Sequence, residues 1–158
     1  GGANERVMRM VDEIGSVDNV HAWVNKALDD KRKIMGMGHR VYKAKDPRAI
    51  VMEDYLKKLA DRKGDSTYYD MLKEIERVFR ERMEEKGKPI YPNVDFFSGA
   101  VYRMLGIPSS LFTPIFAFAR TVGWTAHILE QYSNNRLIRP LSRYTGPTGL
   151  KVAPITQR

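Results

Sequence analysis

Apolar residues recur at spacings of three and four along most of the chain, and this pattern predicts amphipathic helices. Four such stretches cover residues 7–14, 20–28, 50–59 and 71–83. Ser16 or Asp18 can cap the second, Pro47 suits the first turn of the third, and the fourth begins at about Ser66. Glycines follow the first, third and fourth. The first half of the chain is therefore predicted to be a succession of helices, interrupted by a glycine-punctuated loop over residues 34–47.

The second half has a different pattern. Residues 88–95 contain too much proline for a helix, and a short helix is predicted from Phe97 to Leu105. A longer one, from Ser109 to Ser133, is apolar nearly all round, so we expect it to be buried. The tail after Asn135 is rich in proline and glycine and reads as an irregular arm. These elements predict an all-α fold.

The charge of the chain limits the kinds of partner that it could bind. The 158 residues carry a net charge of +8, from 27 basic and 19 acidic side chains, which favours an anionic partner. Either a nucleic acid or a small polyanion would fit. Positive charges are, however, mostly interspersed with negative ones, as over residues 73–77, and such a mixture is typical of a solvated helix face. There is no cysteine, which excludes a thiol nucleophile, and no apolar run long enough to span a membrane. The acidic residues near Gly1 and the lack of an apolar segment there predict no signal peptide.

The segment Gly36-Met37-Gly38-His39-Arg40 is the first candidate for chemistry. Two glycines let the backbone approach a ligand closely, and the adjacent His39 can donate a hydrogen bond or exchange a proton. A flexible turn with a surface histidine explains the same residues.

Asp95, within Asn93-Val94-Asp95-Phe96-Phe97-Ser98-Gly99, is the second candidate. A carboxylate among apolar neighbours has its pKa raised by desolvation, which suits a general base. The alternative is that Asp95 only caps the next helix.

Arginines form the third candidate group. Arg120 interrupts an apolar stretch over residues 115–124, where a buried guanidinium requires a carboxylate or an anionic ligand. Arg48 and Arg139 each lie beside a proline, and their guanidinium groups could bind a carboxylate with two hydrogen bonds in the same way. Taken singly, each is explained as an ordinary surface arginine. By contrast, His21, His39 and His127 show no metal-ligand spacing, and no metal site is expected.

Six motifs in order resemble the citrate synthase family, above all its shorter bacterial and archaeal members and the related 2-methylcitrate synthases. They are Gly1-Gly2-Ala3-Asn4-Glu5, Gly36-Met37-Gly38-His39-Arg40-Val41-Tyr42, Asp46-Pro47-Arg48, Asn93-Val94-Asp95-Phe96-Phe97-Ser98-Gly99, Ala119-Arg120 and Asn134-Asn135-Arg136-Leu137-Ile138-Arg139-Pro140.

The resemblance implies a reaction that joins acetyl-CoA to oxaloacetate and hydrolyses the product thioester to citrate and CoA. His39 matches the histidine that donates a hydrogen bond to the oxaloacetate carbonyl, and Asp95 matches the base that removes a proton from the acetyl methyl group. Arg48, Arg120 and Arg139 match arginines that hold carboxylates. The implied CoA contacts are Ile34, Met35, Gly36, Met37, Gly38 and Lys43. CoA enters as a substrate, and no separate cofactor is expected.

The resemblance also implies a larger enzyme. In the family a histidine that steadies the acetyl-CoA enol directly precedes the Gly-Gly-Ala-Asn-Glu motif, after a large helical domain. Residues 1–106 then correspond to a small domain, and residues 107–158 to a helix and arm that return to the large one. We expect a cytoplasmic homodimer in which Arg139 completes the partner's site, and no catalysis by these 158 residues alone. Use of propionyl-CoA, as in 2-methylcitrate synthase, and a basic helical module for nucleic acid remain the alternatives.

Overall fold

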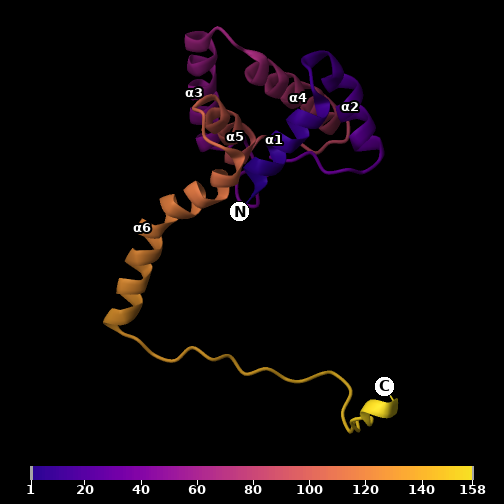
Figure 1. The fold of residues 1–158 in the computed structure, drawn as a ribbon, viewed down its shortest axis with the longest axis vertical. Coiled ribbons are helices and arrows are strands. Elements are labelled where there is room, and N and C mark those ends of the chain that lie inside the picture. The colour runs from indigo at the N-terminus through magenta and orange to yellow at the C-terminus, as the bar shows by residue number, and fades with distance from the viewer. Residues whose placement is uncertain (1, 158) are drawn as a thin grey trace. The chain divides into compact units, whose positions relative to one another are not determined.

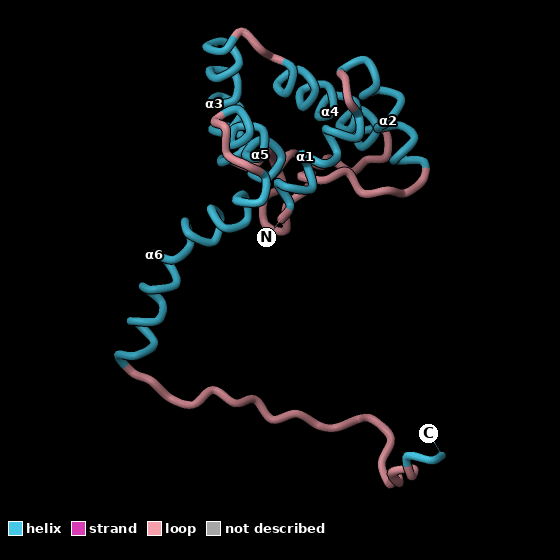
Figure 2. Tube along the Cα trace, viewed as in Figure 1, coloured by secondary structure: helices cyan, strands magenta, loops and turns pink. Residues whose placement is uncertain are grey.

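A computed structural model describes residues 2–157, and within that range every regular element is helical (Figure 2). The predicted all-α fold is thus confirmed. The elements are α1 (Ala3–Ile14), α2 (Val17–Asp29), α3 (Pro47–Lys63), α4 (Thr67–Glu84), α5 (Val94–Met104), α6 (Phe112–Ser133) and two 3-10 turns, Ser109–Leu111 and Ile155–Gln157.

The chain divides into two units, residues 1–122 and residues 123–158. The first unit holds α1 to α5 and the beginning of α6, and it contains the hydrophobic core. The second holds the remainder of α6 and the arm. The boundary predicted near Gly106 concerns two domains of a larger enzyme and stays a prediction.

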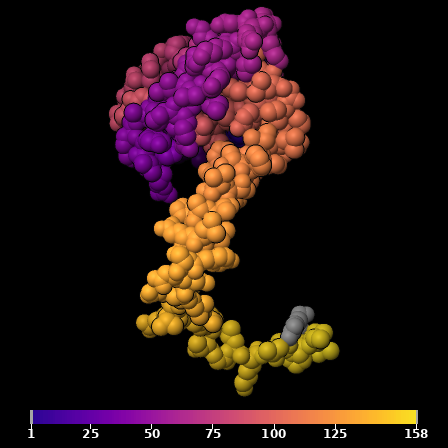
Figure 3. Space-filling model, turned by 90° about the vertical axis from the view of Figure 1, so that its left-hand side faces the viewer, coloured from indigo at the N-terminus to yellow at the C-terminus, as the bar shows by residue number. Residues whose placement is uncertain are grey.

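Helix α5 is the centre of the first unit, because it packs against both α1 and α3 (Figure 1). Atoms of α3 and α5 lie side by side in the space-filling view, in magenta and orange (Figure 3). Gly99 allows α5 to approach α1 closely, since a Cβ atom there would lie 2.8 Å from the Asn4 carbonyl oxygen. The start of α5, which carries Asp95, is therefore held by two neighbouring helices.

Helix ends follow the predicted signals in several places. Pro47 begins α3 as predicted, and Gly64 ends it in the left-handed conformation. The predicted start of α5 at Phe97 is wrong, because the helix begins three residues earlier, where the Asn93 side chain caps it. The long helix begins at Phe112 instead of Ser109, after a 3-10 turn.

The expectation that the long helix is buried is not met within this chain. Only Phe112 is buried in α6, and every residue from Phe118 to Ser133 is exposed. None of the helices in the described range is long and apolar enough to cross a membrane.

Candidate active site

The glycine-rich loop and the segment before α5 lie against each other, although more than fifty residues separate them in the sequence. The Gly38 amide donates to the Tyr91 carbonyl at 2.8 Å, and the Asn93 amide donates to the Gly36 carbonyl at 2.9 Å. The Asn93 side chain also donates to the Gly38 carbonyl, at 2.8 Å. These backbone contacts bring the motifs that contain His39 and Asp95 to one place.

His39 has a defined tautomer. The amides of Val41 and Tyr42 both donate to its Nδ1 atom at 3.1 Å, so Nδ1 accepts and the proton of the neutral ring lies on Nε2. Arg48 Nη2 lies 3.4 Å from this Nε2. Two donors thus face each other, and an oxygen acceptor such as a carbonyl or carboxylate can bind to both.

A buried carboxylate holds Arg48 in place. Asp46 is fully buried; its Oδ1 accepts from Arg48 Nε at 3.1 Å and its Oδ2 from Arg48 Nη2 at 2.8 Å. The same carboxylate accepts the Arg48 amide and, at 3.3 Å, the Val94 amide at the start of α5. Hydrogen bonds from Arg48 hold the pKa of Asp46 below its ordinary value, which outweighs the effect of burial. The Arg48 guanidinium is therefore held in a fixed orientation by Asp46, while half of the side chain remains exposed.

Asp95 does not act as the helix cap. The cap of α5 is Asn93, whose Oδ1 accepts a hydrogen bond from the Asp95 amide at 3.0 Å. The oxygens of the Asp95 carboxylate therefore do not cap the helix. Burial raises the pKa of Asp95 above its ordinary value, and the positive charges of Arg48 and Arg120 act in the opposite direction. A carboxylate in this setting suits a general base, and the capping alternative is excluded.

Arg120 belongs to the same unit, and within this chain it is exposed, so the predicted burial is not met here. Its side chain lies on the exposed part of α6, with the guanidinium 4.3 Å from the centre of the Phe116 ring. The aromatic face supplies the stabilisation that a buried carboxylate was expected to provide. Its charge still reaches Asp95.

The residues predicted to contact CoA divide by burial. Ile34, Gly36 and Met37 are buried in this chain. Lys43 is exposed, and it shares with Gly38 and His39 a hollow of about 150 Å³. The other lining residues of that hollow are Tyr42, Ala44, Pro89, Ile90 and Tyr91.

Arg139 lies in the second unit, on the exposed, non-helical stretch that follows α6. Two residues with clear roles, Asp46 and Asn93, had no assigned function from the sequence. The signal that could have found them is their position, since both Asp and Asn favour the residue before the first turn of a helix.

Proton-accepting and hydrogen-bond-donating groups that converge beside arginines are typical of an enzyme acting on an anionic substrate. Comparisons with known proteins make this class specific. The family model for the citrate synthase C-terminal domain matches residues 1–141. The chain belongs to the citrate synthase family.

Individual relatives show how much of an enzyme the chain represents. It is 52% identical over 158 residues to a citrate synthase of Synechocystis sp., covering 100% of this chain and 39% of that one. It is 46% identical to 2-methylcitrate synthase 1 of Corynebacterium glutamicum, covering 100% and 40%. The solved ternary complex of the Thermoplasma acidophilum citrate synthase, with carboxymethyl coenzyme A and oxaloacetate, is 38% identical with a TM-score of 0.82, covering 100% and 42%. The chain thus spans about two fifths of these proteins.

Proposed function

We propose that an enzyme containing this chain condenses acetyl-CoA with oxaloacetate and hydrolyses the thioester to citrate and CoA. The observation that carries the proposal is the facing pair of donors, His39 Nε2 and Arg48 Nη2, 3.4 Å apart. The charge of this same Arg48 acts on the carboxylate of Asp95, which does not cap α5. The relatives named citrate synthase, and the related structure solved with oxaloacetate, support the choice of substrates.

In this mechanism each group has one task. Asp95 removes a proton from the methyl group of acetyl-CoA, and the carbon of the resulting enolate attacks the ketone carbon of oxaloacetate. His39 Nε2–H donates to the ketone oxygen and stabilises the negative charge that develops there. Arg48 and Arg120 bind carboxylates, and water then cleaves the citryl thioester. General-base catalysis and carbonyl polarisation must act together, because a proton next to a thioester is only weakly acidic.

Free thiol should appear when acetyl-CoA and oxaloacetate are supplied together, and not when either is omitted. We expect propionyl-CoA to react with a kcat/KM about 10–200-fold lower, since one methylene in a pocket changes binding by roughly 1–3 kcal/mol. The measurement is thiol release by an enzyme that contains this chain, with each acyl-CoA in turn. A preference for propionyl-CoA would favour 2-methylcitrate synthase, whose relatives are 46% identical, and no turnover with either would contradict the proposal.

We propose no turnover by residues 1–158 alone, because they span only about two fifths of related enzymes. A role in the tricarboxylic acid cycle and a cytoplasmic location belong to the same proposal. Binding of nucleic acid is not favoured, because many of the basic side chains form ion pairs with carboxylates of this same chain. Examples are Arg32 with Glu13 and Arg77 with Glu74.

The proposed enzyme is a homodimer in which Arg139 binds a substrate carboxylate in the partner's site. Pro140 restricts Arg139 to an extended backbone, and the residues around it in the second unit are exposed. The exposed apolar side chains of α6, such as Phe118 and Val122, favour coverage by another surface.

Subunit complementation tests this assignment. Arg139→Ala and Asp95→Asn variants, each inactive alone, are mixed under conditions that exchange subunits. If Arg139 acts in the partner's site, a mixed dimer has one site with both defects and one intact site, so we expect up to a quarter of wild-type activity, with half the dimers mixed. If Arg139 acts within its own subunit, every site keeps a defect and no activity returns.

A further inference from the structure

Four charged side chains meet beneath the loop that carries His39, and we call them the Lys45 cluster: Lys45, Glu53, Lys73 and Glu76. Lys45 Nζ donates to carboxylates of both Glu53 and Glu76, the latter at 2.8 Å. Lys73 Nζ lies 2.7 Å from Glu53 and 2.8 Å from Glu76. Each lysine thus contacts both glutamates, in a closed arrangement with no net charge.

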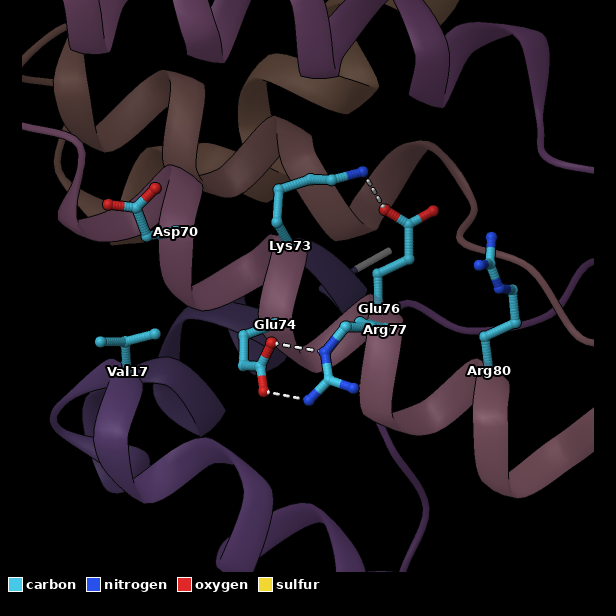
Figure 4. Close-up of a pocket in the computed structure, with 7 residues that line it drawn as sticks. All are labelled: Val17, Asp70, Lys73, Glu74, Glu76, Arg77 and Arg80. Carbon is cyan, nitrogen blue, oxygen red and sulfur yellow. Dashed lines mark hydrogen bonds and ion pairs between the residues drawn. The ribbon is translucent and has the colours of Figure 1, made fainter.

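The cluster is separate from the surface ion pairs of α4. Figure 4 shows Lys73 bonded to Glu76 and, apart from them, Arg77 bonded to Glu74, along the wall of a hollow of about 390 Å³. As many acidic as basic side chains line that hollow, so its charge does not favour a ligand of either sign. The Lys73–Glu76 pair instead extends the contacts of Lys45, which comes from outside α4.

Burial makes the cluster sensitive to the loss of one member. Glu76 is 8% exposed and the Glu53 side chain 19%. Burial alone would raise the pKa of Glu53, but hydrogen bonds from Lys45 and Lys73 hold that pKa below its ordinary value. If Lys45 lost its charge, two shielded carboxylates would share one lysine, and removing one partner of a buried pair is far more costly than losing a surface pair.

Lys45 also connects the loop that carries His39 to helices α3, α4 and α5. It directly precedes Asp46, whose carboxylate binds Arg48 and the Val94 amide. Its Nζ lies 5.0 Å from the centre of the Phe97 ring, which is fully buried in α5 two residues after Asp95. One side chain therefore joins the loop to α3 and α4 through ion pairs, and to α5 through an aromatic face.

We propose that Lys45 is a positioning residue: its cluster holds the loop of residues 39–46 so that His39 and Arg48 face Asp95. The inference rests on the proposed function for its catalytic consequence, although the holding of the loop can be measured without turnover. A merely stabilising cluster would affect the whole first unit equally. A positioning cluster affects the loop first, because Lys45 is the only one of its four members that the loop supplies.

The first measurement is steady-state kinetics of Lys45→Met in the full-length enzyme. We expect kcat/KM for oxaloacetate to fall about 10–100-fold, the scale of a displacement near 1 Å, mainly through a higher KM. The reason is that His39 and Arg48, which would bind oxaloacetate, lie in or beside the loop, whereas Asp95 is held by its own helix. Lys45→Arg should restore most of the loss. Lys58→Met is the matched control, because Lys58 also pairs with a carboxylate and an aromatic ring, but on the exposed face of α3.

The second measurement is amide hydrogen exchange in the same full-length proteins. In Lys45→Met, peptides covering residues 39–46 should exchange about tenfold faster, while peptides of α1 are unchanged. Equal acceleration everywhere, or an unchanged loop, would overturn the proposal. If Lys45→Met does not fold, Glu53→Gln is measured in its place, with the same expected pattern. A wild-type enzyme without citrate synthase activity would sink the proposed function alone, since loop exchange would still decide whether Lys45 holds the loop.

Discussion

Replacing Asp95 with asparagine is expected to lower kcat about 10²–10⁴-fold in an enzyme containing this chain, while oxaloacetate still binds. The amide has nearly the same shape, but it cannot accept the proton from the acetyl methyl group. Because Asn93, not Asp95, caps α5, the substitution leaves the helix start intact. The measurements are thiol release for kcat and calorimetric titration for oxaloacetate binding.

The pKa of Asp95 adds a second, opposite expectation. Burial raises this pKa in the folded protein, so Asp95 ionises less readily in the folded than in the unfolded state. The protonated form of Asp95 therefore contributes to the free energy of unfolding at low pH. This contribution is lost as pH rises through the folded pKa. Asp95→Asn removes this effect and should leave stability at neutral pH unchanged or slightly higher. The acidic limb of the wild-type kcat/KM profile should lie above the ordinary aspartate value of 3.8.

Asp46→Asn is the matched control, because the pKa of Asp46 is lowered instead of raised. Its ionised form is stabilised by folding, so this variant should be less stable at neutral pH, and the difference from wild type should shrink as pH falls through the folded pKa of Asp46. Near-normal kcat in Asp95→Asn would remove Asp95 from the role of base. A loss of stability as large as that of Asp46→Asn would point to a structural role.

Gly36→Ala is expected to cost about 2–5 kcal/mol of stability. Gly36 has a φ of +79°, which costs a residue with a side chain roughly 1–2 kcal/mol. In addition, a Cβ atom there would lie 2.8 Å from Phe96 Cα, and overpacking of a core typically costs about 1–3 kcal/mol. The measurement is the free energy of unfolding from denaturant titration.

Gly64→Ala separates the two causes. Gly64 has a φ of +64° but no atom within 4 Å of an added Cβ, so its substitution should cost only about 1–2 kcal/mol. The excess at Gly36 reports the contact with α5. Equal losses at both positions would show that the loop moves away from Phe96 without cost.

The sequence by itself predicted the helices of the first unit well, because helix periodicity and caps are local signals. Pro47 and Gly64 mark the ends of α3 as expected. The boundary of α5 was harder, since a proline-rich stretch disfavours a helix while the capping side chain of Asn93 permits one to begin immediately after it.

The candidate site shows the same division. The motifs around His39 and Asp95 were visible in the sequence, but each had an alternative explanation. For Asp95 the tertiary structure removed the capping alternative, because the cap proved to be Asn93. The role of Asp95 as a general base stays a prediction, which the raised pKa of its carboxyl supports.

Other features depended on contacts between distant segments. The Lys45 cluster joins a loop to two helices, and the buried Asp46 joins Arg48 to α5, so no local pattern predicted either. Arg120 illustrates the reverse case: its apolar neighbours predicted burial, whereas within this chain α6 is exposed there and the guanidinium lies 4.3 Å from the centre of the Phe116 ring. Local sequence determined where backbone hydrogen bonds close into helices, because those bonds join near neighbours. Burial and charge pairing were decided by tertiary structure, because they depend on which distant surfaces meet.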